Sequence, residues 1–360
     1  MKEPTICLTG GHLTPAIAVI EEIQKQHLPW KLMFIGRRQA FEGGGSPAHE
    51  ERLVTSLGVS FHGLIAGRFP RSWSPVAMFS LLKVPVGFVQ ALWILLRHRP
   101  TMIVSFGGYI ALPVVMAAWF LGIGYMTHEQ TEDLGLANAM IARFARSVLL
   151  ARKSGVPIRS MLFHPPKQSS FSVEREHPIL YITGGSTGAQ SLNALIFPLV
   201  RELTMSFTLV HQVGAADLEK AHRIKESLSP QTRGRYVIAD YFDTPDLAWI
   251  YHHLSLLVGR AGANTVAETA ALGIPSLFIP LPWAAADEQT KNAQQLVHEG
   301  MAVVCEQSAL TAWSLLVQIQ DMVNSIEQYK NEAIRIAKHY PRDGAAMVVK
   351  EIQRLMTASS

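Results

Sequence analysis

A short sequence pattern near the start of the chain is repeated near its middle. Ile6 to His12 and Leu180 to Ser186 each run from an apolar segment into Thr-Gly-Gly, and apolar residues at helical spacing follow. A buried strand that enters a glycine turn and then a helix is typical of the first unit of a doubly wound α/β domain. Because one such domain needs a single first strand, the repeat predicts two α/β domains.

The rest of the chain has the same rhythm, in which short apolar runs alternate with longer segments of 3.6-residue periodicity. This alternation is typical of parallel sheets with crossover helices. The predicted strands are Thr5 to Leu8, Leu32 to Ile35, Met102 to Ser105, Ile179 to Ile182, Thr208 to Gln212, Tyr236 to Ala239, Leu254 to Val258, Ser276 to Ile279 and Ala302 to Cys305. The predicted helices are Pro15 to Gln26, Pro75 to Leu96, Leu136 to Phe144, Ser191 to Glu202, Asn264 to Leu272, Asp287 to Glu299 and Ala345 to Leu355.

The segment from Val156 to His177 is rich in proline, serine and polar residues and has no periodicity, which is typical of a linker. We therefore expect two Rossmann-like domains of the α/β class, 1–163 and 164–343, with doubly wound parallel sheets whose strand ends face a central cleft.

Composition narrows the class of protein. With 48% hydrophobic and 17% charged residues, the chain has enough apolar matter for a globular core. The net charge of +4 is too small to indicate a nucleic-acid binder, but it suits a phosphate-bearing ligand or an anionic membrane surface. Cys7 and Cys305 lie in predicted buried strands, so we expect no disulfide framework and a reducing compartment. No signal peptide is visible, which favours the cytoplasm.

Four glycine turns follow predicted strands: Thr9 to His12, Phe106 to Tyr109, Thr183 to Gly188 and Gly259 to Ala263. Ligands of open parallel sheets bind beyond the carboxyl ends of the strands, where such turns expose backbone N–H groups and helix dipoles to phosphate. A single glycine turn is weak evidence, since many only permit tight packing. Four such turns, distributed over both halves of the chain, predict phosphate binding.

The segment from Val258 to Glu268 is the most informative of these. The helix that begins after its turn presents N–H groups to a diphosphate, and Thr265 adds a hydroxyl donor. Glu268 follows about one helical turn later, where a carboxylate can accept from both hydroxyls of a ribose. The alternative is that Glu268 only complements the positive helix N-terminus.

Two further segments carry candidate site residues. A proline-rich loop, Pro280 to Trp283, leads to Asp287 and Gln289 at a predicted helix start. Gln289 is expected to contact a sugar through its amide, and Asp287 either contacts the ligand or caps the helix. In the first glycine turn, His12 could accept a proton from an attacking hydroxyl, or it could only satisfy a nearby backbone group.

Several enzyme classes lack their motifs here. The sequence has no Asp-x-Asp triplet, no closely spaced His/Cys cluster with the geometry of a metal site, no Gly-Lys-Ser or Gly-Lys-Thr loop and no complete Gly-x-Gly-x-x-Gly. These gaps disfavour a metal-bound transferase, a kinase and a redox Rossmann enzyme, so we expect no metal or other cofactor.

Taken together, these motifs resemble the family of peripheral membrane N-acetylglucosaminyltransferases of GT-B fold that convert lipid I to lipid II in peptidoglycan synthesis. The resemblance covers nearly the whole chain, with departures at Thr131 and Val156, where the family has Asn. The matching pieces are Thr9-Gly10-Gly11-His12 with Pro15, Gly107-Gly108-Tyr109, His128-Glu129-Gln130, Pro157 with Arg159, Thr183-Gly184-Gly185-Ser186, His211-Gln212 with Gly214, Arg260 to Glu268, and Asp287 with Gln289 and Asn292-Ala293.

The resemblance implies that the second domain binds UDP-N-acetylglucosamine, with Glu268 on the ribose, Gln289 on the sugar and a uracil contact near Asp243 or Thr244. His12 is then the general base. Tyr109, His128 and Glu129 belong to the acceptor side, and the helix 344–356 packs back on the first domain. The residues implied to contact substrate are Thr9, Gly10, Gly11, Thr131, Arg159, Ser186, Thr244, Ala263, Asn264, Thr265, Val266, Ala267, Glu268 and Gln289.

The implied reaction is inverting transfer of N-acetylglucosamine to an undecaprenyl-diphosphate-linked muramyl peptide, by a peripheral enzyme at the cytoplasmic face of the cell membrane. Two alternatives are an enzyme of the same fold that acts on a UDP-sugar, such as a UDP-N-acetylglucosamine 2-epimerase, and a non-catalytic binding subunit recruited to the membrane.

One stretch of the first domain mixes basic with aromatic and aliphatic residues. This pattern predicts docking to an anionic membrane surface, and the alternative is an ordinary buried helix with solvated ends. A membrane-spanning helix is disfavoured because Lys83 and Pro85 interrupt the apolar run. The residues are Arg68, Phe69, Arg71, Trp73, Met78, Phe79, Leu82, Lys83, Phe88 and Trp93, followed by Arg97, His98 and Arg99.

Overall fold

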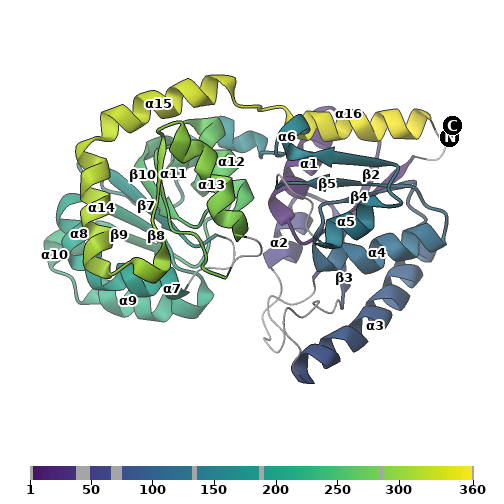
Figure 1. Ribbon diagram of the computed structural model, residues 1–360, viewed down its shortest axis with the longest axis horizontal. Coiled ribbons are helices and arrows are strands. Elements are labelled where there is room, and N and C mark those ends of the chain that lie inside the picture. Colours follow the sequence, from purple (N-terminus) through teal and green to yellow (C-terminus); the bar gives the residue numbers. More distant parts are fainter. Residues whose placement is uncertain are drawn as a thin grey trace. The chain divides into compact units, whose positions relative to one another are not determined.

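The computed structural model describes residues 3–37, 49–65, 75–131, 136–185, 190–283 and 287–358, and it leaves out the side chains at 49, 75–83, 136 and 137. The chain divides into two compact units (Figure 1). Unit 1 is Met1–Ser160 together with Pro341–Ser360, and unit 2 is Met161–Tyr340.

Unit 1 contains a parallel six-stranded sheet in the order β3-β2-β1-β4-β5-β6. The strand order therefore reverses between β1 and β4. From β1 the chain adds β2 and β3 on one side of the sheet, and it then adds β4, β5 and β6 on the other side. The elements are β1 (Thr5–Thr9), α1 (Leu13–Lys25), β2 (Lys31–Arg37), α2 (His49–Ser56), β3 (Ser60–Leu64), α3 (Pro75–His98), β4 (Met102–Ser105), α4 (Gly108–Phe120), β5 (Tyr125–Glu129), α5 (Leu136–Ala142), β6 (Ser147–Leu150), α6 (Ala151–Ser154) and α16 (Gly344–Thr357).

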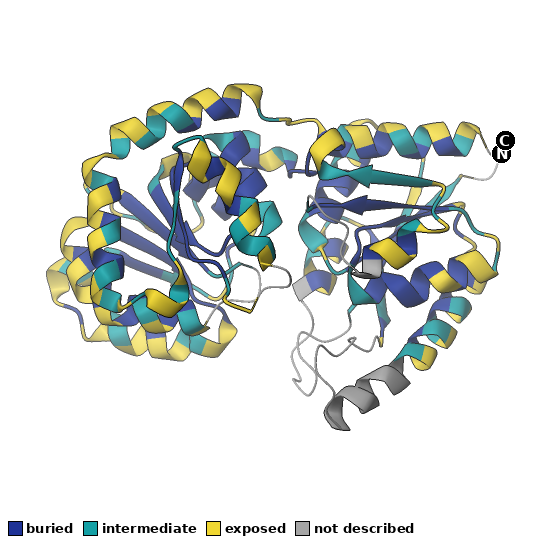
Figure 2. Cartoon of the chain, in the orientation of Figure 1, coloured by how far each residue is buried: buried dark blue, intermediate teal, exposed yellow. Residues whose placement is uncertain are grey.

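The sheet of unit 1 has an apolar core on each face, because neighbouring strand residues point to opposite sides. Ile6 and Leu8 face a cluster that includes Val348 of α16, whereas Cys7 faces a cluster built with α3 and α4. The C-terminal helix α16 lies beside α1 and belongs to the core of unit 1 (Figure 1). Figure 2 shows the buried strands between helices that are exposed on one side only.

Unit 2 repeats this plan with a second parallel six-stranded sheet, in the order β12-β11-β10-β7-β8-β9, which reverses between β7 and β10. Its elements are β7 (Ile179–Thr183), α7 (Gln190–Ile196), η2 (Phe197–Leu199), α8 (Val200–Ser206), β8 (Thr208–Gln212), η3 (Ala215–Asp217), α9 (Leu218–Glu226), α10 (Pro230–Arg233), β9 (Tyr236–Ala239), α11 (Thr244–His253), β10 (Leu254–Gly259), α12 (Ala263–Leu272), β11 (Ser276–Phe278), α13 (Glu288–His298), β12 (Ala302–Val304), η5 (Gln307–Ala309), α14 (Ala312–Asn324) and α15 (Ile326–His339).

The nine predicted strands are all present, and the structure adds β3, β5 and β6. Helix α4 has no polar face for periodicity to reveal, since its residues are apolar almost throughout. The predicted helix from Ser191 to Glu202 is wrong as a single element, because a 3-10 turn that contains Pro198 separates α7 from α8. Cys7 is buried as expected, but Cys305 is half-buried and follows β12.

The segment from Val156 to His177 is irregular, but it is not a loose linker. Ser160–Phe163 forms a 3-10 turn, and Val156, Ile158 and Leu162 are buried. Further along, the backbone N–H and hydroxyl of Ser170 both donate to the carboxylate of Asp246 on α11. The boundary between the two units falls in this segment. Its tertiary contacts were not predicted, because the turn chemistry of proline and serine does not reveal them.

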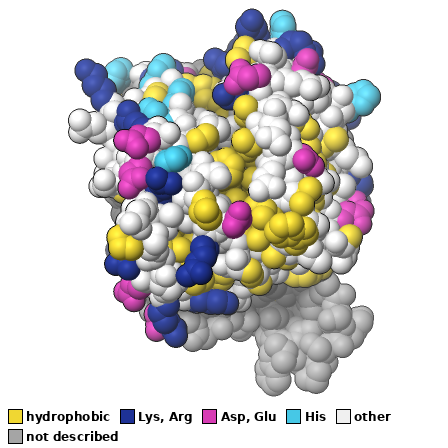
Figure 3. All heavy atoms as spheres, turned by 90° about the vertical axis from the view of Figure 1, so that its left-hand side faces the viewer, with side chains coloured by type: hydrophobic (Ala, Val, Ile, Leu, Met, Phe, Trp, Pro, Cys, Tyr) yellow, Lys and Arg dark blue, Asp and Glu magenta, His cyan; other side chains and the backbone are white. Residues whose placement is uncertain are grey.

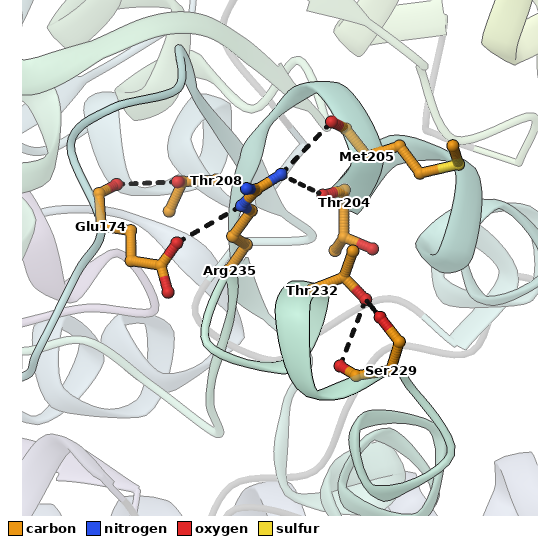
Figure 4. A network of polar contacts seen from close by, with 7 residues as sticks. All are labelled: Glu174, Thr204, Met205, Thr208, Ser229, Thr232 and Arg235. Atoms are coloured by element: carbon orange, nitrogen blue, oxygen red, sulfur yellow. Dashed lines mark hydrogen bonds and ion pairs between the residues drawn. The ribbon is translucent and has the colours of Figure 1, made fainter.

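A polar network holds the last part of this segment to the sheet of unit 2 (Figure 4). Arg235, just before β9, donates to the carboxylate of Glu174 over 3.3 Å and to the carbonyl oxygens of Thr204 and Met205 at the end of α8. The hydroxyl of Thr208 donates to the carbonyl of Glu174 over 2.7 Å. Arg235 thus satisfies helix-end carbonyls and anchors the incoming chain at once.

His211 is buried within unit 2 as a neutral imidazole. Its Nε2 lies 3.1 Å from Oδ1 of Asn193, which can only accept, so Nδ1 is left to accept from the Tyr236 hydroxyl at 3.1 Å. Full burial lowers the pKa of His211 to about 3, because the charged form loses its hydration.

We expect unit 2 to lose stability as the pH falls below 6.5, since the unfolded chain then binds a proton at His211 that the folded chain refuses. Between the unfolded pKa near 6.5 and the folded pKa, this histidine should lower the free energy of unfolding by about 1.4 kcal/mol per pH unit. Chemical denaturation at several pH values tests this. His211→Gln should reduce the slope, whereas His222→Gln at an exposed position should not. Equal slopes in the two variants would contradict the assignment.

Candidate active site

The glycine turns of unit 1 meet where its sheet reverses. The N–H of Gly11 donates to the carbonyl of Gly107 over 2.8 Å, and the N–H of Phe106 donates to the carbonyl of Thr9 over 2.8 Å. A Cβ on Gly10 would lie 2.9 Å from the carbonyl carbon of Phe106. The turns after β1 and β4 therefore approach so closely that side chains do not fit between them.

The same arrangement occurs in unit 2, between β7 and β10. Thr183 and Gly259 are register partners at the ends of these strands, and a Cβ on Gly259 would lie 2.7 Å from the carbonyl oxygen of Thr183. Open parallel sheets bind ligands at such reversal points. Ser186, which was expected near the phosphates, lies outside the described residues.

Helix α12 begins at this reversal point of unit 2. Gly262 is its N-cap and offers no side chain, so the first-turn N–H groups of Ala263, Asn264 and Thr265 have no intrahelical partner. Beside them, Oδ1 of Asn264 is buried without a hydrogen-bond partner in the described structure. Unsatisfied donors and a positive helix end at one place make a site for an anion such as a diphosphate.

Glu268 lies on the inner face of α12 and is only 4% exposed. Its Oε2 accepts a hydrogen bond from the hydroxyl of Tyr251 over 3.1 Å. A carboxylate that served the helix dipole alone could remain hydrated, whereas a buried one needs donors around it. This position favours the ribose interpretation of Glu268. Val266 and Ala267 are buried beside it in the same helix.

The structure changes the interpretation of Gln289 and Asp287, at the start of α13. Oε1 of Gln289 accepts from the N–H of Leu281 over 3.0 Å, so the amide oxygen holds the proline-rich loop. The amide nitrogen can still donate to a sugar. Asp287 occupies the N-cap of α13 in a left-handed conformation, but its side chain caps no backbone N–H. Its carboxylate instead accepts from the hydroxyl of Thr290 over 2.7 Å.

Sequence reasoning assigned no role to Arg260, although it lies in the most informative segment, Val258 to Glu268. The guanidinium is buried and donates to the carbonyl of Ile279 over 2.7 Å, to Oγ of Ser191 over 2.7 Å and to Oε1 of Gln307 over 2.6 Å. Burial lowers the pKa of Arg260 to about 10. Arg260 therefore ties three loops at the carboxyl edge of the sheet together.

Sequence reasoning also assigned no role to Gln212, the last residue of β8. Its Nε2 donates to the carbonyl of Gly185 over 2.8 Å, and its Oε1 accepts from the N–H of Phe242 over 3.1 Å. The amide thus connects the turn after β7 with the loop that leads to Thr244, the buried first residue of α11. Only its place at a strand end could have indicated this role.

His12 is the N-cap residue of α1 in unit 1, and its side chain is exposed and caps no backbone N–H. Loss of hydration to the surrounding chain lowers its pKa below the ordinary value, and the charge of Glu129 acts in the opposite direction. An imidazole that is neutral near pH 7 can accept a proton. Thr9 points elsewhere, since its hydroxyl donates to the carbonyl of Ile35 over 2.9 Å.

The acceptor-side residues prove to be more deeply buried than expected. His128 is fully buried, with Nε2 3.2 Å from both the hydroxyl of Ser154 and the carbonyl of Gly155, and burial lowers its pKa to about 4. The Nε2 of His128 is thus engaged by partners inside unit 1, and the expectation that this residue faces an acceptor stays a prediction.

Glu129 is the centre of a hydrogen-bond network. Its Oε1 accepts from the N–H of Gln130 and from the N–H and hydroxyl of Thr131, and its Oε2 accepts from Nδ2 of Asn138 over 2.7 Å. Asn138 also fills the space that a side chain on Gly107 would need. The network fixes a carboxylate beside the first glycine turns, and Asn138 was not predicted.

Two other predicted residues also have partners inside unit 1. Arg159 is only 3% exposed and lowers the pKa of Glu21, although burial of that carboxyl raises the pKa more strongly. Tyr109 is half-buried near the guanidinium of Arg37, which forms an ion pair with Glu50 at 2.7 Å.

A cavity of about 600 Å³ in unit 1 lies away from these residues, at the amino ends of β1 and β2. Its lining includes Thr5, Trp30, Lys31 and Arg97, and none of the predicted site residues. Within the described ranges, no group of three or more His, Cys, Asp or Glu residues is arranged to hold a metal ion. No helix in the described part of the chain is both long enough and apolar enough to cross a membrane.

Comparison with known proteins decides the family. The glycosyltransferase family 28 N-terminal domain matches residues 5–150, and the family 28 C-terminal domain matches residues 179–348. The chain belongs to glycosyltransferase family 28. Its two sheets are the two Rossmann-like domains of the GT-B fold, as predicted.

Relatives place this glycosyltransferase more narrowly, with the MurG proteins. The UDP-N-acetylglucosamine--N-acetylmuramyl-(pentapeptide) pyrophosphoryl-undecaprenol N-acetylglucosamine transferase of Lawsonia intracellularis is 32% identical over 98% of this chain and 96% of its own length. The enzyme of that name from Desulforudis audaxviator is 30% identical, with 88% of both chains covered. The crystal structure of Acinetobacter baumannii MurG has a TM-score of 0.67 at 25% identity and covers 98% of this chain and 99% of its own.

Two glycines of one turn give a matched test of the steric constraint in this family 28 chain. Gly259→Ala should lower the melting temperature and weaken UDP binding, because the new Cβ would meet the carbonyl of Thr183. Gly262→Ala should change the free energy of unfolding by no more than about 0.5 kcal/mol, since no atom lies within 4 Å of its Cβ position. Thermal unfolding and calorimetry with UDP measure both. Equal melting temperatures for the two variants would contradict the close-approach argument.

Proposed function

We propose that this enzyme transfers N-acetylglucosamine from UDP-N-acetylglucosamine to the muramyl sugar of an undecaprenyl-diphosphate-linked peptide, the step from lipid I to lipid II in peptidoglycan synthesis. The observation that supports this proposal most directly is made at the reversal point of unit 2. There the uncapped N-terminus of α12 lies about one helical turn from the buried carboxylate of Glu268. Relatives that bear the name of this transferase align over nearly the whole chain, which supports the assignment.

Two parts of α12 bind two different parts of the donor nucleotide. The first-turn N–H groups and the hydroxyl of Thr265 hold the diphosphate, and the carboxylate of Glu268 accepts from the ribose hydroxyls. As the bond between the anomeric carbon and the diphosphate breaks, negative charge develops on UDP. The fixed dipoles at the start of α12 stabilise that charge without reorganising.

The acceptor hydroxyl attacks the anomeric carbon as the UDP oxygen leaves, so the configuration inverts. His12 accepts the hydroxyl proton. Its lowered pKa keeps the imidazole neutral at physiological pH, and the charge of Glu129 stabilises the imidazolium that forms. Unit 1 thus supplies the proton acceptor, and unit 2 supplies the donor site.

The acceptor dependence of UDP release separates this function from a UDP-sugar epimerase of the same fold. Purified protein should release UDP from UDP-N-acetylglucosamine only when a lipid I analogue is present, and mass analysis should find the disaccharide product. Release of UDP without acceptor, or conversion of the donor alone, would overturn the transferase assignment.

His12→Ala should lower turnover about a hundred- to ten-thousandfold and leave UDP affinity unchanged, because a general base contributes to the rate and not to donor binding. In the native enzyme, activity should fall on the acid side of pH 6.5, where protonation of His12 removes the base. Steady-state kinetics and calorimetry with UDP test both points. His27→Ala, at another exposed position of unit 1, is the control. Near-normal turnover in His12→Ala would require another base.

We further propose that unit 1 binds the cytoplasmic face of the membrane through its exposed apolar side chains. Helix α3 packs against α4, and α4 packs against α5. Trp93, Trp119 and Phe144 are 63%, 60% and 57% exposed, and the rings of Trp119 and Phe144 lie 5.6 Å apart. The apolar patch comprises Val86, Val89, Trp93 and Leu96 of α3, Met116, Trp119 and Phe120 of α4, and Met140 of α5 with Phe144.

Basic side chains border this apolar patch. The guanidinium of Arg97 lies 5.8 Å from the ring of Trp93, and that of Arg143 lies 5.9 Å from the ring of Phe144. Aromatic side chains that enter the interface and cations beside anionic headgroups together bind a peripheral protein. Of the stretch singled out in the sequence, Arg68 to Trp73 and the side chains of Met78, Phe79, Leu82 and Lys83 lie outside the described residues.

The double variant Trp93→Ser/Trp119→Ser should bind anionic vesicles at least about tenfold more weakly, because two large apolar side chains no longer leave water. Raising the salt concentration should weaken binding of the native protein as well. Trp313→Ser is the control, since Trp313 is 72% exposed in unit 2. On the face of unit 2 in Figure 3, hydrophobic side chains are interspersed with charges of both signs. Co-sedimentation with anionic vesicles measures the binding. If the native protein does not sediment with these vesicles at low salt, the proposal is contradicted.

A further inference from the structure

Tyr251 connects α11 to the carboxylate that binds ribose in the proposed function. Its hydroxyl donates to Oε2 of Glu268 over 3.1 Å, and both side chains are buried, at 6% and 4% exposure. The ring of Tyr251 packs edge-on against that of Tyr181 on the first strand of unit 2, with centroids 6.0 Å apart. The buried hydroxyl of Tyr251 therefore acts directly on the carboxylate of Glu268.

The helix that carries Tyr251 is held along its length. At its start, the Asp243 carboxylate accepts from the N–H of Asp246 over 3.3 Å, and Asp246 in turn accepts from Ser170. Near its end, Trp249 is fully buried and stacks on His253 with ring centroids 4.1 Å apart. These contacts hold α11 in place, so they also fix the position of the Tyr251 hydroxyl.

We propose that Tyr251 is a positioning residue for ribose recognition, and this inference rests on the proposed function in which Glu268 binds the ribose hydroxyls. A carboxylate offers two oxygens and about four lone pairs. A donor on Oε2 stops rotation of the carboxylate about its last bond, so the lone pairs that face the nucleotide keep one direction. Preorganisation of this kind strengthens binding because less freedom is lost when the ligand arrives.

A double-mutant cycle with two nucleotides tests the proposal. Calorimetry would compare UDP with 2′,3′-dideoxy-UDP on the native enzyme, Tyr251→Phe, Glu268→Gln and the double variant. Tyr251→Phe should bind UDP about tenfold more weakly, as expected for the loss of a hydrogen bond to a charged group, and should bind dideoxy-UDP as the native enzyme does. In the Glu268→Gln background, Tyr251→Phe should have no further effect on UDP.

Tyr236→Phe is the matched control, since it removes a buried hydroxyl whose partner is His211 and should leave the ratio of the two affinities unchanged. If the native enzyme binds both nucleotides equally, the ribose role of Glu268 fails. If the native enzyme discriminates and Tyr251→Phe discriminates equally, Glu268 keeps its role and the positioning role of Tyr251 is overturned. Equal weakening of both nucleotides by Tyr251→Phe would also overturn it, because that result indicates structural damage alone.

Discussion

The close approach of two backbone turns at each sheet reversal is the constraint on which the site depends. Gly10 packs against the backbone of Phe106, and Gly259 packs against that of Thr183, at distances that leave no room for a Cβ. Because these turns touch, α1, α4 and α12 begin at the strand ends with N–H groups that no N-cap side chain satisfies. A side chain at either glycine would separate the turns and move the start of the helix. The backbone geometry at each reversal point is therefore a consequence of steric contact between main chains.

Buried polar side chains then hold the loops around these turns. Arg260 and Gln212 in unit 2 each bond to two or more segments that are far apart in sequence. In unit 1, Glu129 bonds to Asn138 and to the residues that directly follow it. Burying such groups costs free energy unless their donors and acceptors are paired. Since most of their atoms are paired, these residues fix loop geometry, and removing one partner would leave the others unsatisfied at the site. The stability of the loops and the precision of the site thus have the same origin.

The sequence was informative wherever local chemistry decides the structure. Apolar runs located nine strands, and Thr-Gly-Gly turns located both reversal points, because strand burial and positive-φ turns each have a residue signature. Strand β5 was missed since it buries Thr127, His128 and Glu129, and α4 was missed since it has no polar face. The partners of Arg260, Gln212 and Gln289 come from distant segments, so no local pattern could reveal them. Glu268 was placed at the site from spacing alone, but its contact with Tyr251 depends on how α11 packs.

The two units use one architecture for different chemical tasks, and the difference lies in what surrounds the reversal point. In unit 2, the groups there are N–H dipoles and a buried carboxylate held by a tyrosine, which suits binding a nucleotide in one orientation. In unit 1, the corresponding place has an exposed imidazole whose pKa is lowered by loss of hydration, an effect that the charge of Glu129 opposes. Such a group can change its protonation state, whereas the fixed dipoles of unit 2 do not change. A repeated fold can thus carry different chemical groups at its two sites, because each sheet reversal presents its own side chains to an otherwise similar backbone site.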